Sequence, residues 1–356
     1  ESRMAEMAKT PRFTKEEIIR IVKEQNIRFV RLQFTDIFGQ CKNVAITESQ
    51  LEKALANKCM FDGSSIEGFV RIEESDMYLY PDWDTFEIFP WRPQQGKVAR
   101  FICDVHYPDG RPFEGDPRNV LKRVLKKAKD MGYTFMAGPE CEFFLFHTDE
   151  EGRATTVTHE TAGYCDGGTI DLAESVRRDM LLGLEEAGIQ VEYVTHGCAP
   201  GQHVFRLKAR RGVQAADELL AFRAIIRRTA KSHGLHASFM PKPLNGFGGS
   251  GLEIEVLPEL IQKSRGEEKE RKALCLEAAE RLRQSLGEMA LLTNPLVNSY
   301  RRLAALREEG ADREDFVRSS ETGLQFFLAD SSVNPYWPLR LCWQLGFGEQ
   351  EERTKI

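Results

Sequence analysis

The chain has 356 residues, of which 41% are hydrophobic and 29% charged, as expected for a globular protein with room for two cores. The formal net charge is −6 with acidic and basic residues interspersed, so the sequence offers no extended positive surface for nucleic acid. The eight cysteines include no C-x-x-C pair, and no apolar run approaches the ~20 residues of a membrane helix, which indicates reduced thiols in a cytoplasmic protein.

The first elements suggest a small mixed domain. We interpret residues 1–12 as a loose tail or a remnant of an expression tag. Thr14 and Glu17 form a capping-box pattern that predicts a short helix. Residues 27–34 alternate between apolar and polar side chains, and a second alternating run contains Val44 and Ile46, so the two runs predict a β-hairpin.

Further signals extend this domain to residue 113. Thr47 and Gln50 resemble a second capping box, which predicts another short helix, and strand-like runs follow at 78–90 and 98–104. We therefore predict an α+β domain over 13–113.

The GDPR segment at 115–118 is a turn signal with proline at a helix-starting position, and it marks the predicted domain boundary. A helix is expected from Asn119 to about Met131, followed by a strand over 133–146. Beyond it, over 114–356, we predict helices at about 173–187, 213–233 and 267–291, and strands at 190–195, 203–207, 236–240 and 252–257.

Several long segments give the chain a family resemblance. They are MFDGSSIEGF at 60–69, GKVARFICDV at 96–105, FEGDPR at 113–118, GPECEFFLF at 138–146 and HGLHASFMPKP at 233–243. In order and spacing they resemble the bacterial type I glutamine synthetase family. The resemblance implies an N-terminal β-grasp domain and a larger catalytic domain with a curved antiparallel sheet and helices. Because the chain ends soon after NPY at 334–336, we expect a divergent member shortened at its C-terminus.

The resemblance also implies an activity and an assembly. Members of this family form homo-oligomers of two stacked hexameric rings, with each active site between neighbouring subunits. ATP phosphorylates glutamate, and ammonia displaces the phosphate. This chemistry needs two divalent ions, Mg²⁺ or Mn²⁺, held by carboxylates and a histidine, together with several arginines.

Three glutamates are candidate metal ligands. Glu140 and Glu142 are two residues apart on one strand, so both point to the same face, and they match metal-binding positions of the family. Glu253 stands where the family has a metal-binding histidine, with Glu255 two residues further on. We predict at most one divalent site from this set; the alternative is a solvated strand face.

Other family positions are changed. Gly197 and Val204 replace two glutamates that coordinate metal in relatives with activity. Gly323, Gln325 and Phe327 replace the arginines and glutamate of an R-x-E-x-R pattern, and the arginine-rich segment before it is shortened. Since one arginine can contribute about 10³–10⁵ in kcat to phosphoryl transfer, we expect activity to be lost and ATP binding to be doubtful. Arg302 remains as a candidate partner for a glutamate carboxylate.

The DGSS loop is retained. In the family the position of Asp62 helps to bind ammonium, so we name Asp62 and Ser65 as remnant catalytic positions. The alternative is that this loop is kept for packing between subunits. We expect an interface built on the apolar side chains of residues 60–80, namely Phe61, Ile66, Phe69, Val70, Met77 and Tyr78.

These observations leave three hypotheses. The first is a catalytically inactive, oligomeric scaffold or regulatory partner in nitrogen metabolism, which could assemble with an active glutamine synthetase. The second is an active glutamine synthetase or a related ATP-dependent carboxylate–amine ligase with a reduced metal site. The third is a sensor that binds glutamine, glutamate or nucleotide without turnover.

Overall fold

The computed structural model describes residues 12–72, 75–89, 96–261 and 267–348. All but one residue of the predicted tail over 1–12 lies outside the described residues. The chain divides into two compact units, residues 1–119 and 120–356.

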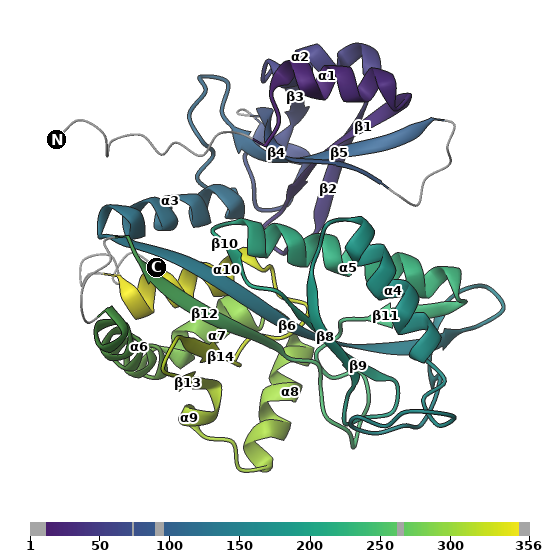
Figure 1. The fold of residues 1–356 in the computed structure, drawn as a ribbon, viewed down its shortest axis with the longest axis vertical. Coiled ribbons are helices and arrows are strands. Elements are labelled where there is room, and N and C mark those ends of the chain that lie inside the picture. Colours follow the sequence, from purple (N-terminus) through teal and green to yellow (C-terminus); the bar gives the residue numbers. More distant parts are fainter. Residues whose placement is uncertain (1–11, 73–74, 90–95, 262–266, 349–356) are drawn as a thin grey trace. The chain divides into compact units, whose positions relative to one another are not determined.

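The first unit is built on a mixed five-stranded sheet (Figure 1). Its strand order is β2-β1-β5-β4-β3, with β1 parallel to β5 and every other neighbouring pair antiparallel. The strands are β1 (Ile27–Thr35), β2 (Cys41–Thr47), β3 (Cys59–Asp62), β4 (Asp76–Ile88) and β5 (Lys97–His106). Helices α1 (Lys15–Glu24) and α2 (Leu51–Leu55) contribute side chains to the same core as the sheet, which gives the β-grasp arrangement.

The local signals of this unit are mostly confirmed. Thr14 and Glu17 form the predicted capping box at the start of α1. Val30 and Leu32 of β1 are fully buried, as the alternating pattern requires. The second capping box was wrong, because the Thr47 side chain pairs with the Ser49 hydroxyl at 2.9 Å and caps nothing. A single 3₁₀ turn, η1 (Glu48–Gln50), forms there before α2.

The second unit contains an antiparallel nine-stranded sheet centred on β6 (Tyr133–Thr148), the long strand that crosses Figure 1. The main strand order is β13-β14-β12-β6-β9-β8, and β7, β10 and β11 also pair with β6. The bounds are β7 (Ala154–Thr158), β8 (Val191–His196), β9 (Gln202–Leu207), β10 (Arg210–Arg211), β11 (Leu235–Ser238), β12 (Leu252–Leu260), β13 (Val317–Ser319) and β14 (Leu324–Phe326).

Of the four helices predicted from residue 119 onward, three begin and end close to the predicted residues, whereas the helices at Val297–Glu308, Arg313–Phe316 and Tyr336–Leu341 were not predicted. Ser285 interrupts the helix expected over 267–291 and separates two shorter helices. The helices are α3 (Pro117–Asp130), α4 (Glu174–Glu186), α5 (Gln214–Ser232), α6 (Glu267–Gln284), α7 (Leu286–Thr293), α8 (Val297–Glu308), α9 (Arg313–Phe316) and α10 (Tyr336–Leu341), which leads into a π-helical turn (Cys342–Phe347). Proline at the first turn of α3 fits, because that position needs no N–H donor.

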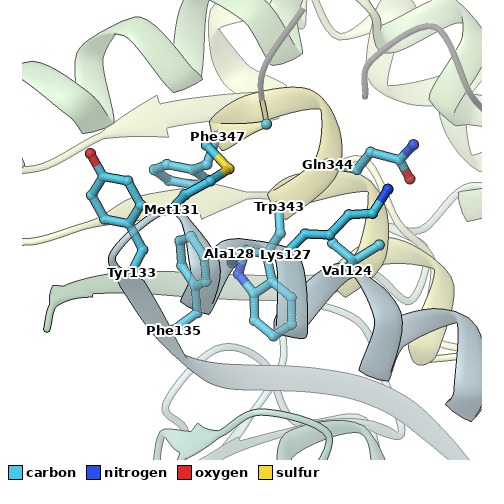
Figure 2. A pocket seen from close by; sticks show the side chains of 10 residues that line it. Val124, Lys127, Ala128, Met131, Tyr133, Phe135, Trp343, Gln344 and Phe347 are labelled. Atoms are coloured by element: carbon cyan, nitrogen blue, oxygen red, sulfur yellow. The ribbon is translucent and has the colours of Figure 1, made fainter. Parts of the chain in front are cut away.

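A small apolar pocket lies beside the π-helical turn (Figure 2). The rings of Phe135 and Trp343 stack with their centroids 5.1 Å apart, and Phe347 packs on Phe135 from the same turn. These contacts attach the end of the described chain to the central strand β6. Within the described ranges, no helix is long and apolar enough to cross a membrane.

Candidate active site

One cross-strand row dominates the polar face of the large sheet. In the pairing of β12, β6 and β9, Glu253 lies opposite Glu140, and Glu140 lies opposite Arg206. Side chains at directly opposed positions project from the same face of a sheet. Two of the predicted metal ligands are therefore neighbours, and an arginine completes their row.

Arg206 bonds to the carboxylates on both sides of it. Its Nη1 lies 3.4 Å from Oε2 of Glu140 and 3.2 Å from Oε1 of Glu253, while Nη2 donates to Oε2 of Glu255 at 2.6 Å. Nε is 3.4 Å from Glu192 at the more exposed rim. The Arg206 side chain is only 11% exposed, so the guanidinium is held inside the acidic cluster.

The pKa values of this cluster reflect both burial and charge. Burial alone would lower the pKa of Arg206, but the surrounding carboxylates, Glu253 first, raise it above its ordinary value. Burial raises the pKa of Glu253, with Glu140 acting in the same direction and Arg206 opposing it. Burial and a hydrogen bond to Glu140 raise the pKa of Tyr193, which therefore stays protonated as a donor to that carboxylate.

Glu142 lies outside the Arg206 network. Its Oε2 accepts a hydrogen bond from the Gly251 N–H at 2.7 Å, and its own N–H donates to the Gly251 carbonyl at 3.2 Å. Burial raises the pKa of Glu142 to about 7, although the Gly251 N–H and the Arg302 charge oppose the shift. The carboxyl group is thus close to half-ionised near neutral pH.

Arg302 is buried next to Gly251, the residue whose backbone holds Glu142. Its Nη2 donates to the Leu328 carbonyl at 2.6 Å and to Oδ1 of Asn294 at 3.2 Å. Burial lowers its pKa, with Asp330 and Glu142 opposing the shift. These contacts hold the guanidinium inside the protein. Its predicted contact with a substrate carboxylate stays a prediction.

Gly197 directly follows β8 and Val204 lies on β9, and both have specific surroundings. A Cβ built on Gly197 would lie 2.6–2.7 Å from Cγ, Cδ and Oε1 of Gln202, a spacing that real Cβ atoms do not reach. The Gln202 amide is itself held, because it accepts from Ala199 N–H and donates to the Gly249 carbonyl, both at 3.1 Å. Val204 is only 5% exposed and lies opposite Glu142.

Gly323, Gln325 and Phe327 lie in or directly beside β14. A Cβ at Gly323 would lie 2.6 Å from the Val256 carbonyl oxygen. Gln325 donates from its amide to Glu253 at 3.1 Å and so joins the acidic cluster. The Phe327 ring lies beneath the Arg318 guanidinium, 5.2 Å from its carbon. The three residues are themselves uncharged, and two of them contact charged side chains, Gln325 the Glu253 carboxylate and Phe327 the Arg318 guanidinium.

A buried group of Glu160, His196 and His203 has metal-ligand chemistry, with its potential ligand atoms within 4.8 Å of one another. Both nitrogens of His196 already have partners at 2.8 Å, the Gly197 carbonyl and Glu160. Although burial alone would lower the pKa of His196, these two hydrogen bonds raise it. The group therefore fits a histidine–carboxylate ion pair better than a bound cation.

His203 supports the same conclusion. Arg177, itself paired with Asp171, donates to Nδ1 of His203 at 3.2 Å. Because arginine only donates, Nδ1 is the acceptor and neutral His203 carries its proton on Nε2. Within the described ranges this Nε2 has no hydrogen-bond partner, but in this tautomer it has no free lone pair for a metal.

In the first unit, the DGSS loop is closed by its own hydrogen bonds. Asp62 accepts from Ser64 N–H at 2.9 Å and from the Ser65 hydroxyl at 2.8 Å. These hydrogen bonds lower the pKa of Asp62, and the largest contribution comes from the Ser64 side chain. Gly63 is required by space, because a Cβ there would lie 2.5 Å from Cγ of Met77.

The apolar side chains predicted for an interface also serve the core of their own unit. Met77 is fully buried, and Phe61 and Phe69 pack on Phe34 with ring centroids 4.8 and 6.1 Å apart. Among the described residues of this segment, the large apolar side chains that are exposed are instead Met60 at 54% and Ile72 at 76%.

Arg206 was missed by the sequence reasoning. The period of a strand places residues 202, 204 and 206 on one face, so Val204 and Arg206 could have been assigned together. Tyr193 was missed for a different reason, since its contact with Glu140 depends on the pairing of β8 with β9.

A β-grasp unit followed by an antiparallel sheet with a carboxylate-rich face defines a specific class of two-unit α+β protein. Residues 26–108 match the family described as "Glutamine synthetase, beta-Grasp domain", and residues 114–312 match "Glutamine synthetase, catalytic domain". The chain belongs to the glutamine synthetase family.

Named relatives agree over nearly the whole chain. A glutamine synthetase from Clostridium saccharobutylicum is 50% identical over 353 residues, covering 94% of this chain and 79% of the relative. One from Staphylococcus aureus (strain Mu50 / ATCC 700699) is 45% identical over 362 residues, covering 97% and 81%. The chain thus spans about four-fifths of the length of these relatives.

Solved structures agree on the fold. The structure described as "Apo GmaS without ligand" has a TM-score of 0.80 at 25% identity and covers 94% of this chain and 81% of that one. A Plasmodium falciparum glutamine synthetase has a TM-score of 0.80 at 19% identity, covering 98% and 77%.

Proposed function

We propose that the chain is an ATP-dependent carboxylate–amine ligase of the glutamine synthetase type that works with a reduced metal site. The observation that carries this proposal is the 45–50% identity, over nearly the full chain, to relatives named glutamine synthetase. It favours the ligase hypothesis over the inactive scaffold that the sequence first suggested. Glutamate, ammonia and ATP would be the substrates, as the family resemblance implies.

The chain's own residues limit how such a ligase could use divalent ions. Glu140 and Glu253 are engaged by Arg206 and do not fit Mg²⁺ or Mn²⁺ as they stand. Glu142 keeps a carboxylate outside that network, held by the Gly251 N–H, with a pKa near neutrality. Its role would be to hold or release a proton, or to contribute a single oxygen ligand.

An inactive scaffold is the second candidate, and one observation favours it: the largely buried Arg206 guanidinium contacts Glu140 and Glu253, two positions that the family resemblance assigns to metal binding. In that case the protein would act through homo-oligomers formed by its N-terminal unit, or through assembly with an active glutamine synthetase. ATP binding would then be dispensable.

A direct assay separates the candidates. Purified protein would be given ATP, glutamate and ammonium with Mg²⁺ or Mn²⁺, and ADP and glutamine would be measured together with γ-glutamyl transfer. A ligase yields ADP and glutamine in equal amounts, and Glu142→Gln reduces both while Glu185→Gln on the exposed face of α4 does not. ADP formation no faster than in a protein-free control contradicts the ligase and supports the scaffold.

A further inference from the structure

We propose that the Arg206 guanidinium is a built-in cation that takes the place of a divalent ion between Glu140, Glu253 and Glu255. The inference goes beyond the proposed function, because it concerns how this cluster is neutralised whether or not the chain turns over substrate. It rests on the position of Arg206 in the sheet, on its contacts and on the donors around it.

The sheet itself fixes the position of the cation. Arg206 on β9 is directly opposite Glu140 on β6, which is directly opposite Glu253 on β12. Cross-strand neighbours of this kind are about 4.5–5.5 Å apart at Cβ, so a long side chain at one end of the row reaches across the next strand. The guanidinium therefore reaches both glutamates without distortion of the backbone register.

The contacts of Arg206 fill the volume that an ion would use. Nη1 is 3.4 Å from Glu140 Oε2 and 3.2 Å from Glu253 Oε1, so a single nitrogen bridges the two carboxylates. Mg²⁺ would hold such oxygens at about 2.0–2.1 Å in near-octahedral geometry. An ion in contact with the same two oxygens would collide with Nη1 and would face its positive charge.

Neighbouring donors complete the arrangement. Gln325 donates its amide N–H to Oε1 of Glu253 at 3.1 Å, and the Tyr193 hydroxyl donates to Oε2 of Glu140. A glutamate at position 325 would instead bring a like charge against Glu253. Gln325 and Arg206 thus act in the same direction, since both supply hydrogen-bond donors to carboxylates that would otherwise repel one another.

Arginine suits this place better than lysine would. The planar guanidinium presents several N–H groups in a fixed fork, and here they point to Glu140, Glu253, Glu255 and Glu192 at once. A lysine ammonium carries the same charge at one point and cannot reach four carboxylates together. The geometry therefore favours a permanent cation over an exchangeable one.

The test compares divalent binding with and without the arginine. Wild type, Arg206→Ala and the matched control Arg210→Ala would be melted in EDTA and in Mn²⁺, and Mn²⁺ binding would be measured by titration calorimetry and electron paramagnetic resonance. Arg210 is 19% exposed and pairs with Glu218 on the same unit, so it controls for loss of a buried ion pair.

We expect the wild type to melt at the same temperature in EDTA and Mn²⁺. Arg206→Ala should melt lower in EDTA, acquire one Mn²⁺ per chain and recover several degrees in Mn²⁺. Arg210→Ala should lose stability that Mn²⁺ does not restore. Adding Glu253→Gln to Arg206→Ala should abolish the acquired binding.

Two results would overturn the proposal. One is a wild-type Mn²⁺ site that Glu253→Gln removes, and the other is a folded Arg206→Ala protein that gains no Mn²⁺ binding. If Arg206→Ala does not fold, the wild-type titration with Glu253→Gln decides alone: absence of Glu253-dependent Mn²⁺ binding supports the built-in cation. Because none of these readouts uses ATP or glutamate, they are independent of the ligase assay.

Discussion

Val204 lies directly opposite Glu142 in the antiparallel pairing of β9 with β6. The family resemblance places a second metal-binding carboxylate at position 204, so the register still presents the two positions side by side while one of them is apolar. The strand pairing therefore places a buried apolar side chain beside Glu142.

The stability that is lost in the Arg206→Ala variant should depend on pH. Glu140, Glu253 and Glu255 would lose their shared cation, which costs about 3–5 kcal/mol for a fully buried pair and less here, because the carboxylates keep some solvent contact. The pKa of Glu253 is already raised, and loss of Arg206 would raise it further. A raised carboxyl pKa favours folding at low pH, so the deficit should shrink from pH 8 to pH 5.

Urea unfolding of wild type and Arg206→Ala at those two pH values measures this. Arg210→Ala, which removes an arginine paired with a single glutamate, is the control and should show a deficit that changes less. An Arg206→Ala deficit that is equal at both pH values would contradict the prediction.

The stability of the first unit should fall as pH rises, because Asp116 then loses its proton. Burial, and then the nearby Asp104 charge, raise its pKa to about 7 from an ordinary 3.8, although Val105 and Arg118 N–H groups donate to it. The folded state thus binds the extra proton, so stability is full below about pH 4 and falls as pH rises through 7. The loss is on the order of a few kcal/mol.

The measurement is denaturant unfolding across pH 5 to 8, compared with Asp116→Asn. The amide accepts only one of the two backbone hydrogen bonds, which lowers stability by a constant amount, but it cannot titrate. The variant should therefore show a flatter profile than wild type over this range, and parallel profiles would show that Asp116 ionises as an ordinary carboxyl group.

Gly63→Ala should destabilise the first unit by about 1–3 kcal/mol, as overpacking does. The new methyl group would lie 2.5 Å from Cγ of the fully buried Met77 and 3.0 Å from Val70. A double-mutant cycle with Met77→Ala tests the contact, because the shortened side chain makes room for the methyl group. The double variant should lose less stability than the sum of the losses in the two single variants. If the losses simply add, the strain does not come from the contact with Met77.

Met60→Asp with Ile72→Asp should break a homo-oligomer formed through the N-terminal unit. Both side chains are exposed, and Met60 lies on β3, an edge strand of its sheet, where contacts with another chain readily form. Light scattering should show a smaller species for the double variant. Leu291→Asp on α7, 72% exposed, is the control and should leave the mass unchanged. A monomeric wild type at micromolar concentration would remove the basis of the interface.

The sequence predicted elements well where local signals were sufficient. The capping pair Thr14 and Glu17 and the alternation over 27–34 depend only on neighbouring residues, and both were confirmed. The break at Ser285 was not predicted, because the apolar pattern continues across it and tertiary packing decides between one helix and two.

The candidate site was only partly accessible from the sequence. The shared strand face of Glu140 and Glu142 follows from their spacing, but the partners of each come from other strands. Arg206, 66 residues further along the chain, reaches Glu140 only because β9 pairs with β6 in one particular register. Such long-range pairings are not encoded in any local pattern.

The space beside Gly197 couples the side chain at this position to the rotamer of Gln202. Gln202 now fills the place that a longer side chain at 197 would need, and two backbone hydrogen bonds hold it there. The substitution Gly197→Glu would therefore meet a steric barrier before its carboxylate could contribute a ligand. Restoring a carboxylate at 197 therefore requires Gln202 to change rotamer and to give up its contacts with the Ala199 N–H and the Gly249 carbonyl.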